Sequence, residues 1–464
     1  MSPATPRPAT PPPADPGLAR RLNAFDATML VMGGIIGAGI FVSPHVVARH
    51  VQSPALILGA WAAGGVVALI GAFVYAELAA LRPAVGGVYA YIRDAFHPVA
   101  AFLYGWTLLL VVQSGGMAAV AVTFARYFNE LAGFAAPEQA IAVATLAVLT
   151  IVNWLGVRTG SNVQSALMVL KIAAIVALVT IGWLATGGAT PPDAIASPPA
   201  QRPLPASFAA ALVPVLFAFG GWQNASFVAG ELKDPRRDLP RGLLVGVIGV
   251  VVLYLAVNIV CLRALGPSGL AATPAPATAV MRAALGDTGA GLIAAGIAVS
   301  TVGYLSHGML TAPRVYFAMA RDGVFFRRVG SLHPRTHAPA VAIALQGLVA
   351  SIVAFLPYER ILNYVVAIDA MFFGLTGAAL LVFRARERRG AGEPRSPDTA
   401  FRLRTPGHPV TTLIFVAAFW TLALSTVYQF PRDAGVGVLI LVAGVPVYLF
   451  WVGRGRRKGE GVSR

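Results

Sequence analysis

The sequence predicts an all-helical integral membrane protein with twelve transmembrane helices. Of its 464 residues, 57% are hydrophobic and only 12% are charged, and the mean hydropathy is +0.73. A soluble domain carries about 25% charged residues, so this composition excludes an ordinary soluble protein. The apolar residues gather in runs of about 20, the length that a helix needs to cross the hydrocarbon core of a bilayer.

Twelve apolar runs are long enough to be spans. They cover residues 27–48, 54–81, 98–125, 138–157, 162–186, 207–230, 241–262, 289–320, 338–356, 361–383, 410–429 and 435–453. The Pro-rich residues 1–22 precede them and are expected to form a disordered cytoplasmic N-terminus. This segment lacks the charged start and apolar core of a cleavable signal peptide.

The basic residues indicate how the spans are oriented. With the N-terminus inside the cell, the inner segments hold 26 Lys and Arg residues and the outer loops hold seven. The remaining two, Lys171 and Arg314, lie within spans. This bias follows the positive-inside rule and predicts cytoplasmic termini, with the protein in the plasma membrane. The net charge of +16 then reflects topology, and no nucleic-acid partner is expected, because the basic residues do not gather on one soluble face.

Several functional classes lack their sequence signatures. The HExxH motif of zinc enzymes and the phosphate-binding GxxxxGK[ST] loop of active pumps are both absent from the sequence. The single cysteine, Cys261, and the scattered histidines offer no set of metal ligands. We therefore expect neither an enzyme, nor a metal site, nor a cofactor. A channel would be distinguished by conductance that does not saturate.

Two predicted spans are interrupted by glycine near their middle. Residues 33–41 read GGIIGAGIF and residues 216–226 read LFAFGGWQNAS. The two segments lie in the first and the sixth span, five positions apart in the order of spans, so they cross in opposite directions, as the discontinuous helices of inverted transporter repeats do. Close helix packing at Gly33 and Gly37 is the alternative for the first segment. The matched pair favours a binding site.

A break of this kind has a specific chemistry. The N–H groups that begin the second half-helix suit a carboxylate, and the carbonyls that end the first half-helix suit an ammonium or a metal cation. A zwitterionic amino acid carries both charges a few ångströms apart. Glycine permits the unusual backbone dihedrals and leaves room for the ligand. The two breaks therefore predict a site for a small zwitterion.

Four longer motifs carry a family resemblance. They are LNAFDATMLVMGGIIGAGIF at 22–41, YAELAALRPAVGGVYAYIRDAFHP at 75–98, FAFGGWQNASFVAGELKDPRRDLPRGL at 217–243 and TAPRVYFAMARDG at 311–323. In this order they resemble the amino acid–polyamine–organocation (APC) superfamily of transporters, and in particular its bacterial amino acid permeases and L-type amino acid exchangers. The motifs are specific to the family and not to a substrate.

The resemblance implies a particular architecture. Ten core helices form two inverted five-helix repeats with discontinuous first and sixth helices, and two peripheral helices follow. The corresponding segments are 23–186 and 207–384 for the repeats, 385–409 for a basic cytoplasmic loop, 410–453 for the peripheral helices and 454–464 for a basic cytoplasmic tail.

The resemblance also implies a substrate site. Gly37 to Gly39 would supply N–H groups for the substrate carboxylate, and carbonyls near Ile36, Phe217 and Gly220 would take the amino group. Phe217 would close over the substrate from outside. The candidate substrate-binding residues are Ile36, Gly37, Ala38, Gly39, Gln113, Phe217, Ala218, Gly220, Trp222 and Ser306. Ordinary apolar packing is the alternative for Phe217 and Trp222.

Two charged residues lie deep in predicted spans. Lys171 is roughly 14 Å inside the fifth helix, where a lysine costs about 2.5–3.5 kcal/mol. In the resembling family such a lysine stands in for sodium and ties the fifth helix to the first and eighth; a proton-carrying lysine is the alternative. Asp369 lies in the tenth helix and could carry a proton, pair with a basic group or face a hydrated vestibule.

Further polar residues are weaker candidates. Ser300, Thr301 and His307 lie in the middle of the eighth helix with Ser306, where hydrogen bonding within the helix is the common alternative. Related exchangers often have asparagine at the place of Ser306. On the inner side, the expected gate network consists of Glu77, Glu231 and Arg237, with a solvated loop as the alternative.

The preferred interpretation is a secondary active transporter for neutral α-amino acids that works by alternating access without sodium. The alternative is a proton-coupled basic amino acid or polyamine antiporter. A cationic substrate should need acidic groups around its pocket, and the first, third, sixth and eighth helices offer none, which argues against this alternative. Animal exchangers join a partner subunit through a cysteine in the loop after the third helix. The segment here, RYFNELAGFAAPE, has none, so no disulfide-linked partner is expected.

Overall fold

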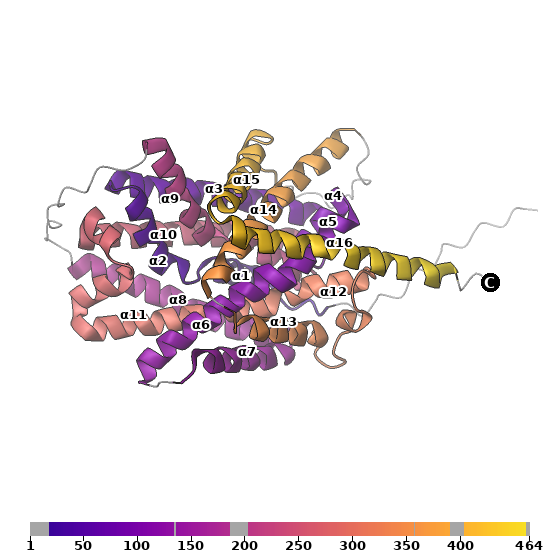
Figure 1. Cartoon of the computed structure of the whole chain (residues 1–464), viewed down its shortest axis with the longest axis horizontal. Coiled ribbons are helices and arrows are strands. Elements are labelled where there is room, and N and C mark those ends of the chain that lie inside the picture. The colour runs from indigo at the N-terminus through magenta and orange to yellow at the C-terminus, as the bar shows by residue number, and fades with distance from the viewer. Residues whose placement is uncertain (1–17, 134–135, 186–202, 357, 390–402, 461–464) are drawn as a thin grey trace, which may run out of the picture.

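The computed structural model describes residues 18–133, 136–185, 203–356, 358–389 and 403–460. In this part of the chain the regular structure is helical, and the only β-type contact is an isolated bridge between Leu22 and Leu232. Most of the long helices run along the longest axis of the molecule (Figure 1). The all-helical membrane fold is therefore confirmed. The expectations for residues 1–17, 390–402 and 461–464 lie outside the described residues.

The described part of the chain consists mainly of helices. In chain order they are α1 (Ala24–Ile35), α2 (Gly39–His50), α3 (Pro54–Leu81), α4 (Val88–Ala95), α5 (Pro98–Thr107), η1 (Leu108–Val112), α6 (Gln113–Ala132), α7 (Glu138–Trp154), α8 (Val157–Ala185), α9 (Leu204–Phe219), η2 (Trp222–Glu231), α10 (Pro235–Ala272), α11 (Pro276–Thr311), α12 (Pro313–Arg321), η3 (Arg327–Gly330), α13 (Ala340–Val353), α14 (Tyr358–Arg388), α15 (Val410–Gln429) and α16 (Pro431–Glu460).

The predicted spans correspond closely to these helices. Within the described residues, nine helical segments are long and apolar enough to cross a membrane, and the bent pair of α1 and α2 makes a tenth. The other two predicted spans, 138–157 and 338–356, correspond to the shorter apolar helices α7 and α13, of 17 and 14 residues. A helix rises 1.5 Å per residue, so α13 alone falls short of a core about 30 Å thick. The count of twelve spans stays a prediction.

The first predicted span is broken where the sequence predicts it. Helix α1 ends at Ile35, Ile36 adopts an extended conformation, and α2 begins at Gly39. The axes of the two half-helices differ by 44°. The N-terminal half is fixed by a capping box, in which the side chains of Asn23 and Asp26 accept hydrogen bonds from each other's backbone N–H groups.

The sixth predicted span is broken at its two glycines. Helix α9 ends at Phe219, and Gly220 is extended. Gly221 has φ +111°, a left-handed conformation that favours glycine, and the chain then continues as the 3₁₀ helix η2. The discontinuous first and sixth helices of the predicted fold are thus present. The assignment of 23–186 and 207–384 to two inverted repeats stays a prediction.

The broken helices lie at the centre of the packing. Helix α1 packs on α10, η2 and α8, while α2 packs on α9 and α10. Around them, α3 packs on α10 and α8 packs on α11, and α14 packs on α15 and α6. Backbone hydrogen bonds join the start of α1 to the end of η2: the N–H groups of Arg21 and Leu22 donate to the carbonyl of Glu231, and Lys233 N–H donates to the carbonyl of Leu22.

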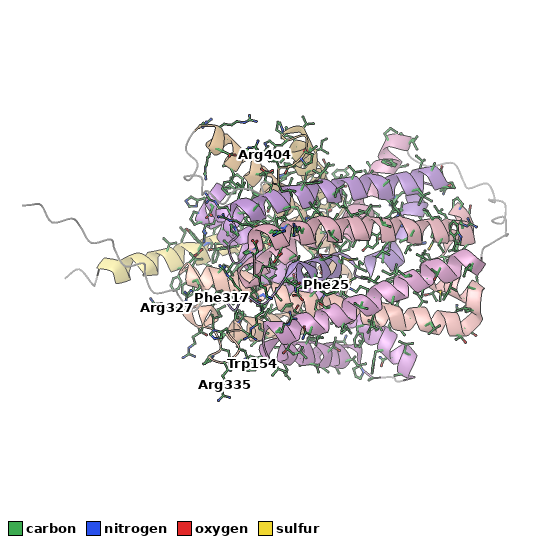
Figure 2. The ribbon with its side chains drawn as sticks, turned by 180° about the vertical axis from the view of Figure 1, so that it is seen from behind. Phe25, Trp154, Phe317, Arg327, Arg335 and Arg404 are labelled. Atoms are coloured by element: carbon green, nitrogen blue, oxygen red, sulfur yellow. The ribbon has the colours of Figure 1, made fainter. Side chains whose placement is uncertain are left out.

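Arginines mark one end of the molecule. Figure 2 labels Arg327, Arg335 and Arg404, which lie toward the end from which the C-terminal helix α16 protrudes. Helices α4 and α12 lie at this same end, whereas α2 and α9 lie toward the other (Figure 1). The two predicted inner loops that hold Arg327, Arg335 and Arg404 therefore lie toward the same end of the fold.

Candidate functional site

A cavity of about 260 Å³ lies between the two breaks. At the α1–α2 break, the cavity is lined by Gly34, Ile35 and residues 37–39. At the second break, it is lined by Phe217, Ala218, Gly220 and Gly221. Helices α6, α11, α14 and α15, together with η1 and the start of η2, supply the remaining walls. Both glycine-rich segments singled out by the sequence therefore face one common space.

Two glycines let the broken segments touch. A Cβ atom added at Gly34 would overlap the carbonyl oxygen of Gly221, and one added at Gly221 would overlap the carbonyl oxygen of Gly34. A Cβ at Gly34 would also lie 2.8 Å from Nε2 of His307. The two backbones thus meet without side chains between them, and any larger residue would push the breaks apart.

The start of α2 offers backbone donors to the cavity. Gly37 N–H already donates to the carbonyl of Ile35 at 2.9 Å. Ala38 and Gly39 are half-buried, line the cavity and begin α2. The first N–H groups of a helix have no partner within it, and in the described residues no other group takes those of Ala38 and Gly39. The donors available for an anion are therefore these two, rather than the three expected from Gly37 to Gly39.

Carbonyl groups at both breaks accept hydrogen bonds from within the protein. The Tyr254 hydroxyl lies 3.1 Å from the carbonyl oxygen of Ile35 and 3.3 Å from that of Ala218, so it joins the two broken helices. The carbonyl of Phe217 accepts the N–H of Gly220 at 3.0 Å. Ile36 is fully buried and does not line the cavity.

Lys171 binds the backbone of the α1–α2 break from outside the cavity. Its side chain is buried in α8, and its ammonium donates a hydrogen bond to the carbonyl of Ile36. On the other side it meets α11 at Gly303, where an added Cβ would lie 3.3 Å from Nζ. Lys171 thus connects α8 with the break in α1 and with α11. Among the described residues no carboxylate forms an ion pair with it.

The candidates on α11 differ in what they contact. The Ser300 hydroxyl lies 3.2 Å from the carbonyl oxygen of Gly37 and donates to it, so α11 also holds the break. Thr301 bonds back to Ala298 of its own helix at 2.7 Å. Ser306 and His307 are fully buried, and in the described residues their polar side-chain atoms have no hydrogen-bond partner. None of these four lines the cavity.

The two aromatic candidates on the sixth span occupy different environments. Phe217 is 44% exposed and lines the cavity. Trp222 is fully buried outside it, in an aromatic cluster with Tyr75, Phe373, Phe415 and Phe419. Two of its contacts, Phe373 and Phe419, do line the cavity.

Several polar residues of the cavity were not predicted from the sequence. The candidate Gln113 lines the cavity, and it is joined there by Gln223, Asn224 and Tyr304, which were not among the candidates. Gln223 accepts the N–H of Gly221 at 2.9 Å, which steadies the second break. The helical spacing of four between Ser300 and Tyr304 places both on one face of α11, and this signal could have pointed to Tyr304.

Asp369 also lines the cavity, from α14. Its carboxylate belongs to a wall that α14 forms with the neighbouring helix α15, since Phe419 and Leu422 of α15 line the same space. A position that lines the cavity is compatible both with a proton carrier and with a hydrated vestibule, so these two alternatives stay predictions. No ion pair with a basic residue is present in the described residues.

Comparison with known proteins identifies the family. The family model described as amino acid permease matches residues 22–451. The chain belongs to the amino acid permease family. The APC superfamily resemblance carried by the four sequence motifs is thereby confirmed.

Several curated proteins are similar to the permease over nearly its whole length. The mouse Asc-type amino acid transporter 1 is 30% identical over 448 residues, which cover 94% of the permease and 82% of the relative. The mouse large neutral amino acids transporter small subunit 2 is 30% identical over 453 residues, covering 94% and 81%. The Bacillus subtilis serine/threonine exchanger SteT is 27% identical over 440 residues, covering 94% and 97%. All are named as transporters or exchangers, so the permease is not an enzyme.

The inner charges of the permease form separate contacts rather than one network. Glu77 pairs with Arg384 at 2.6 Å and accepts the N–H of Thr405 at 2.7 Å. Glu231 pairs with Arg314 at 2.9 Å, and both side chains are fully buried. Arg237 is exposed, and within the described residues it forms no ion pair with either carboxylate.

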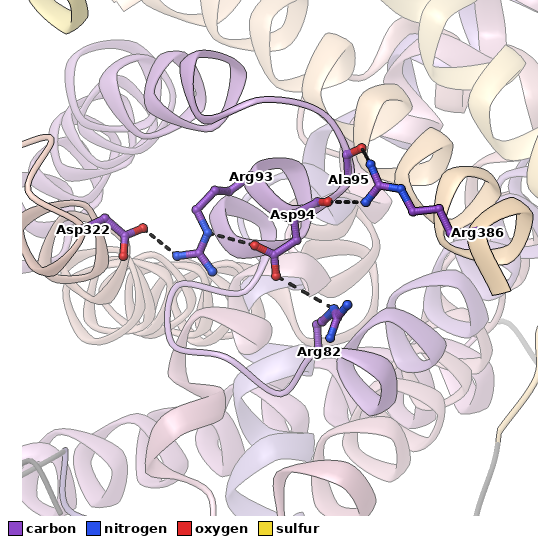
Figure 3. A network of polar contacts seen from close by, with 6 residues as sticks. All are labelled: Arg82, Arg93, Asp94, Ala95, Asp322 and Arg386. Carbon is purple, nitrogen blue, oxygen red and sulfur yellow. Dashed lines mark hydrogen bonds and ion pairs between the residues drawn. The ribbon is translucent and has the colours of Figure 1, made fainter. Parts of the chain in front are cut away.

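A second group of charges lies around α4 (Figure 3). Arg93 contacts Asp94 at 2.9 Å and Asp322, beyond α12, at 2.6 Å. Arg386 of α14 donates to the backbone carbonyls of Asp94 and Ala95. These contacts tie α4, α12 and α14 together at the end of the permease that carries the C-terminus.

Proposed function

We propose that the permease is a secondary active transporter that moves neutral α-amino acids across the membrane by alternating access. The observation that carries this proposal is the contact between Gly34 and Gly221, which brings two broken helices to one cavity. Gly-interrupted helices that meet near the middle of the membrane are the usual binding site of such transporters.

The ligand chemistry follows from the groups that face the cavity. The N–H groups of Ala38 and Gly39 at the start of α2 suit the substrate carboxylate. The carbonyls at the end of α9, near Phe217 and Gly220, suit the substrate ammonium. Phe217, exposed to the cavity, is proposed to close over the bound amino acid. These contacts bind only the carboxylate and ammonium that all α-amino acids share. Other residues of the cavity must therefore select the substrate's side chain.

We propose that transport does not require sodium. A sodium ion at the break would need carbonyl oxygens as ligands, and the ammonium of Lys171 already occupies the carbonyl of Ile36. The same lysine reaches α11 at Gly303, so it can hold the two helices together as an ion would. Exchange of one amino acid for another needs no ion gradient. In the proton-coupled alternative, Asp369 is the proposed carrier, because it faces the cavity.

Two relatives support neutral substrates through their names. One is named for large neutral amino acids and another for serine and threonine. We propose the same broad class here, together with a plasma-membrane location and cytoplasmic termini from the bias of basic residues. We also propose that no partner subunit is joined by a disulfide, because the only cysteine, Cys261, is buried.

Purified permease in proteoliposomes tests the proposal. The vesicles are loaded with unlabelled alanine, serine or leucine, and counterflow of the labelled amino acid is followed in sodium and in choline buffers. We expect saturable counterflow at equal rates in both buffers. Uptake that requires a sodium gradient would refute the sodium-independent part, and no saturable uptake of any α-amino acid would refute the transport proposal itself.

A further inference from the structure

An aromatic contact joins the loop after α12 to the end of α16. The ring of Phe326, directly before η3, packs edge-on against that of Trp451, with the ring centroids 5.1 Å apart. Phe325 is buried and packs against Phe326 at the same centroid distance, so Phe326 is held from the protein side as well. The contact ties η3 to the last part of the C-terminal span.

Trp451 marks the level at which α16 leaves the membrane. The apolar run 435–453 ends two residues after it, and the sequence of the helix then continues with four basic residues, Arg454, Arg456, Arg457 and Lys458. Tryptophan is enriched where a span meets the headgroup region. Phe326, which touches Trp451, therefore lies at that level too, and 58% of its surface is exposed. An exposed aromatic ring at this depth offers a contact surface for lipid acyl chains.

Two arginines follow Phe326 directly. Arg327 and Arg328 are exposed, and among the described residues neither forms an ion pair with a carboxylate. Residues 323–339 contain no Asp or Glu, and Asp322 just before them is already paired with Arg93 at 2.6 Å. Figure 2 labels Arg327 at the end of the molecule from which α16 protrudes. The positive charge beside the aromatic contact is thus not neutralised within the described part of the chain.

The membrane topology accounts for only part of this arrangement. The positive-inside rule explains basic residues in a predicted inner loop, and Arg335 of the same loop satisfies it. The rule does not call for a largely exposed phenylalanine that packs on a tryptophan between two basic segments. Clusters of Lys and Arg directly beyond a transmembrane helix are typical of sites for anionic lipids.

We propose that η3 and the end of α16 form a binding site for an anionic phospholipid of the adjacent leaflet. The guanidinium groups of Arg327 and Arg328 donate charge-assisted hydrogen bonds to the lipid phosphate, and the exposed ring of Phe326 contacts the acyl chains. The basic residues that follow Trp451 raise the local positive potential. Bound in this way, the lipid links the loop after α12 with the C-terminal span. The site lies apart from the cavity, because none of these residues lines it.

Competition between two lipids tests the inference. The full-length permease is purified in detergent micelles that contain equal amounts of phosphatidylcholine and phosphatidylglycerol with the same acyl chains, and the bound lipids are counted by native mass spectrometry. For the unaltered protein we expect phosphatidylglycerol to be retained in preference to phosphatidylcholine. When Arg327→Gln and Arg328→Gln are combined, we expect this preference to fall at least about fivefold, because each arginine near the surface adds to the attraction of an anionic lipid.

Arg20 and Arg21 give a matched control. They are also adjacent and exposed, but Arg21 is bonded through its backbone to Glu231 of η2, away from α16. Arg20→Gln with Arg21→Gln removes the same charge and should leave the lipid preference unchanged. An equal loss in this control would mean that net charge alone attracts the lipid, and it would overturn the site.

Three other outcomes would contradict the inference. They are no preference for phosphatidylglycerol in the unaltered protein, an unchanged preference after Arg327→Gln with Arg328→Gln, and a bound inorganic phosphate in place of the lipid. Arg327→Lys with Arg328→Lys keeps the charge and is expected to retain the preference. A loss as large as that of the glutamine variant would count against the charge contact.

Discussion

Gly34 and Gly221 pack backbone against backbone where the two broken helices cross, and neither position has room for a Cβ atom. Gly221 has in addition a left-handed conformation, with φ +111°. The contact has a simple consequence. Main-chain atoms therefore set the distance between the two half-helix junctions. Because the cavity lies between these junctions, the same contact sets its width.

Alanine at Gly221 is expected to disrupt this crossing. The left-handed backbone alone costs a non-glycine residue about 1–3 kcal/mol, and the overlap with the Gly34 carbonyl adds to it. We expect a lower thermal unfolding midpoint and loss of amino acid binding, measured on the purified variant. Gly291→Ala is the matched control, because no atom lies within 4 Å of its added Cβ and its backbone is helical. Equal behaviour of the two variants would contradict the role given to the crossing.

Methionine at Lys171 is expected to weaken substrate binding. The change keeps an unbranched side chain but removes the ammonium that bonds the Ile36 carbonyl, and an unsatisfied buried acceptor costs about 1–3 kcal/mol. We expect at least about a tenfold weaker apparent affinity in a thermal-shift titration. Thr180→Val, on the exposed face of the same helix, serves as the control. An affinity unchanged by Lys171→Met would mean that the lysine does not organise the break.

The buried pair of Glu231 and Arg314 is expected to behave as a unit. Removing one partner leaves an uncompensated buried charge, so Glu231→Gln should lower the free energy of unfolding by about 3–5 kcal/mol. Replacing both residues, with leucine at 231 and methionine at 314, should recover part of that loss. Thermal unfolding of the single and double variants checks this. The exposed pair of Arg126 and Glu138 gives the comparison, since Glu138→Gln should cost at most about 1 kcal/mol.

The sequence was sufficient to locate the breaks, because glycine pairs in the middle of two spans that cross in opposite directions are typical of discontinuous helices. It also singled out Lys171, since a lysine in the membrane needs a partner. It did not reveal that Gly37 N–H is used within the break or that Trp222 faces an aromatic cluster. Both depend on how a helix is rotated against its neighbours, and a long apolar span carries little periodic signal for that rotation.

The same limit applies to Asp369 and the inner charges. The depth of Asp369 followed from the length of its span, but the direction in which it faces did not. The lack of acidic residues in the first, third, sixth and eighth spans therefore did not exclude an acidic cavity wall. Arg314 was recognised as lying within a span, yet its pairing with Glu231 joins residues 83 positions apart. Arg237, the basic residue expected in the inner network, is exposed.

Binding of an amino acid at the break between α1 and α2 is the central claim. Gly37 lines the cavity, and a Cβ there would lie 3.6 Å from the Tyr304 ring, an ordinary contact, so a larger side chain would extend into the ligand space. The decisive measurement is the thermal stabilisation of purified Gly37→Leu by the amino acid that stabilises the unaltered protein. We predict a folded variant whose unfolding midpoint no longer responds to that amino acid. A full ligand-induced shift in Gly37→Leu would contradict the claim.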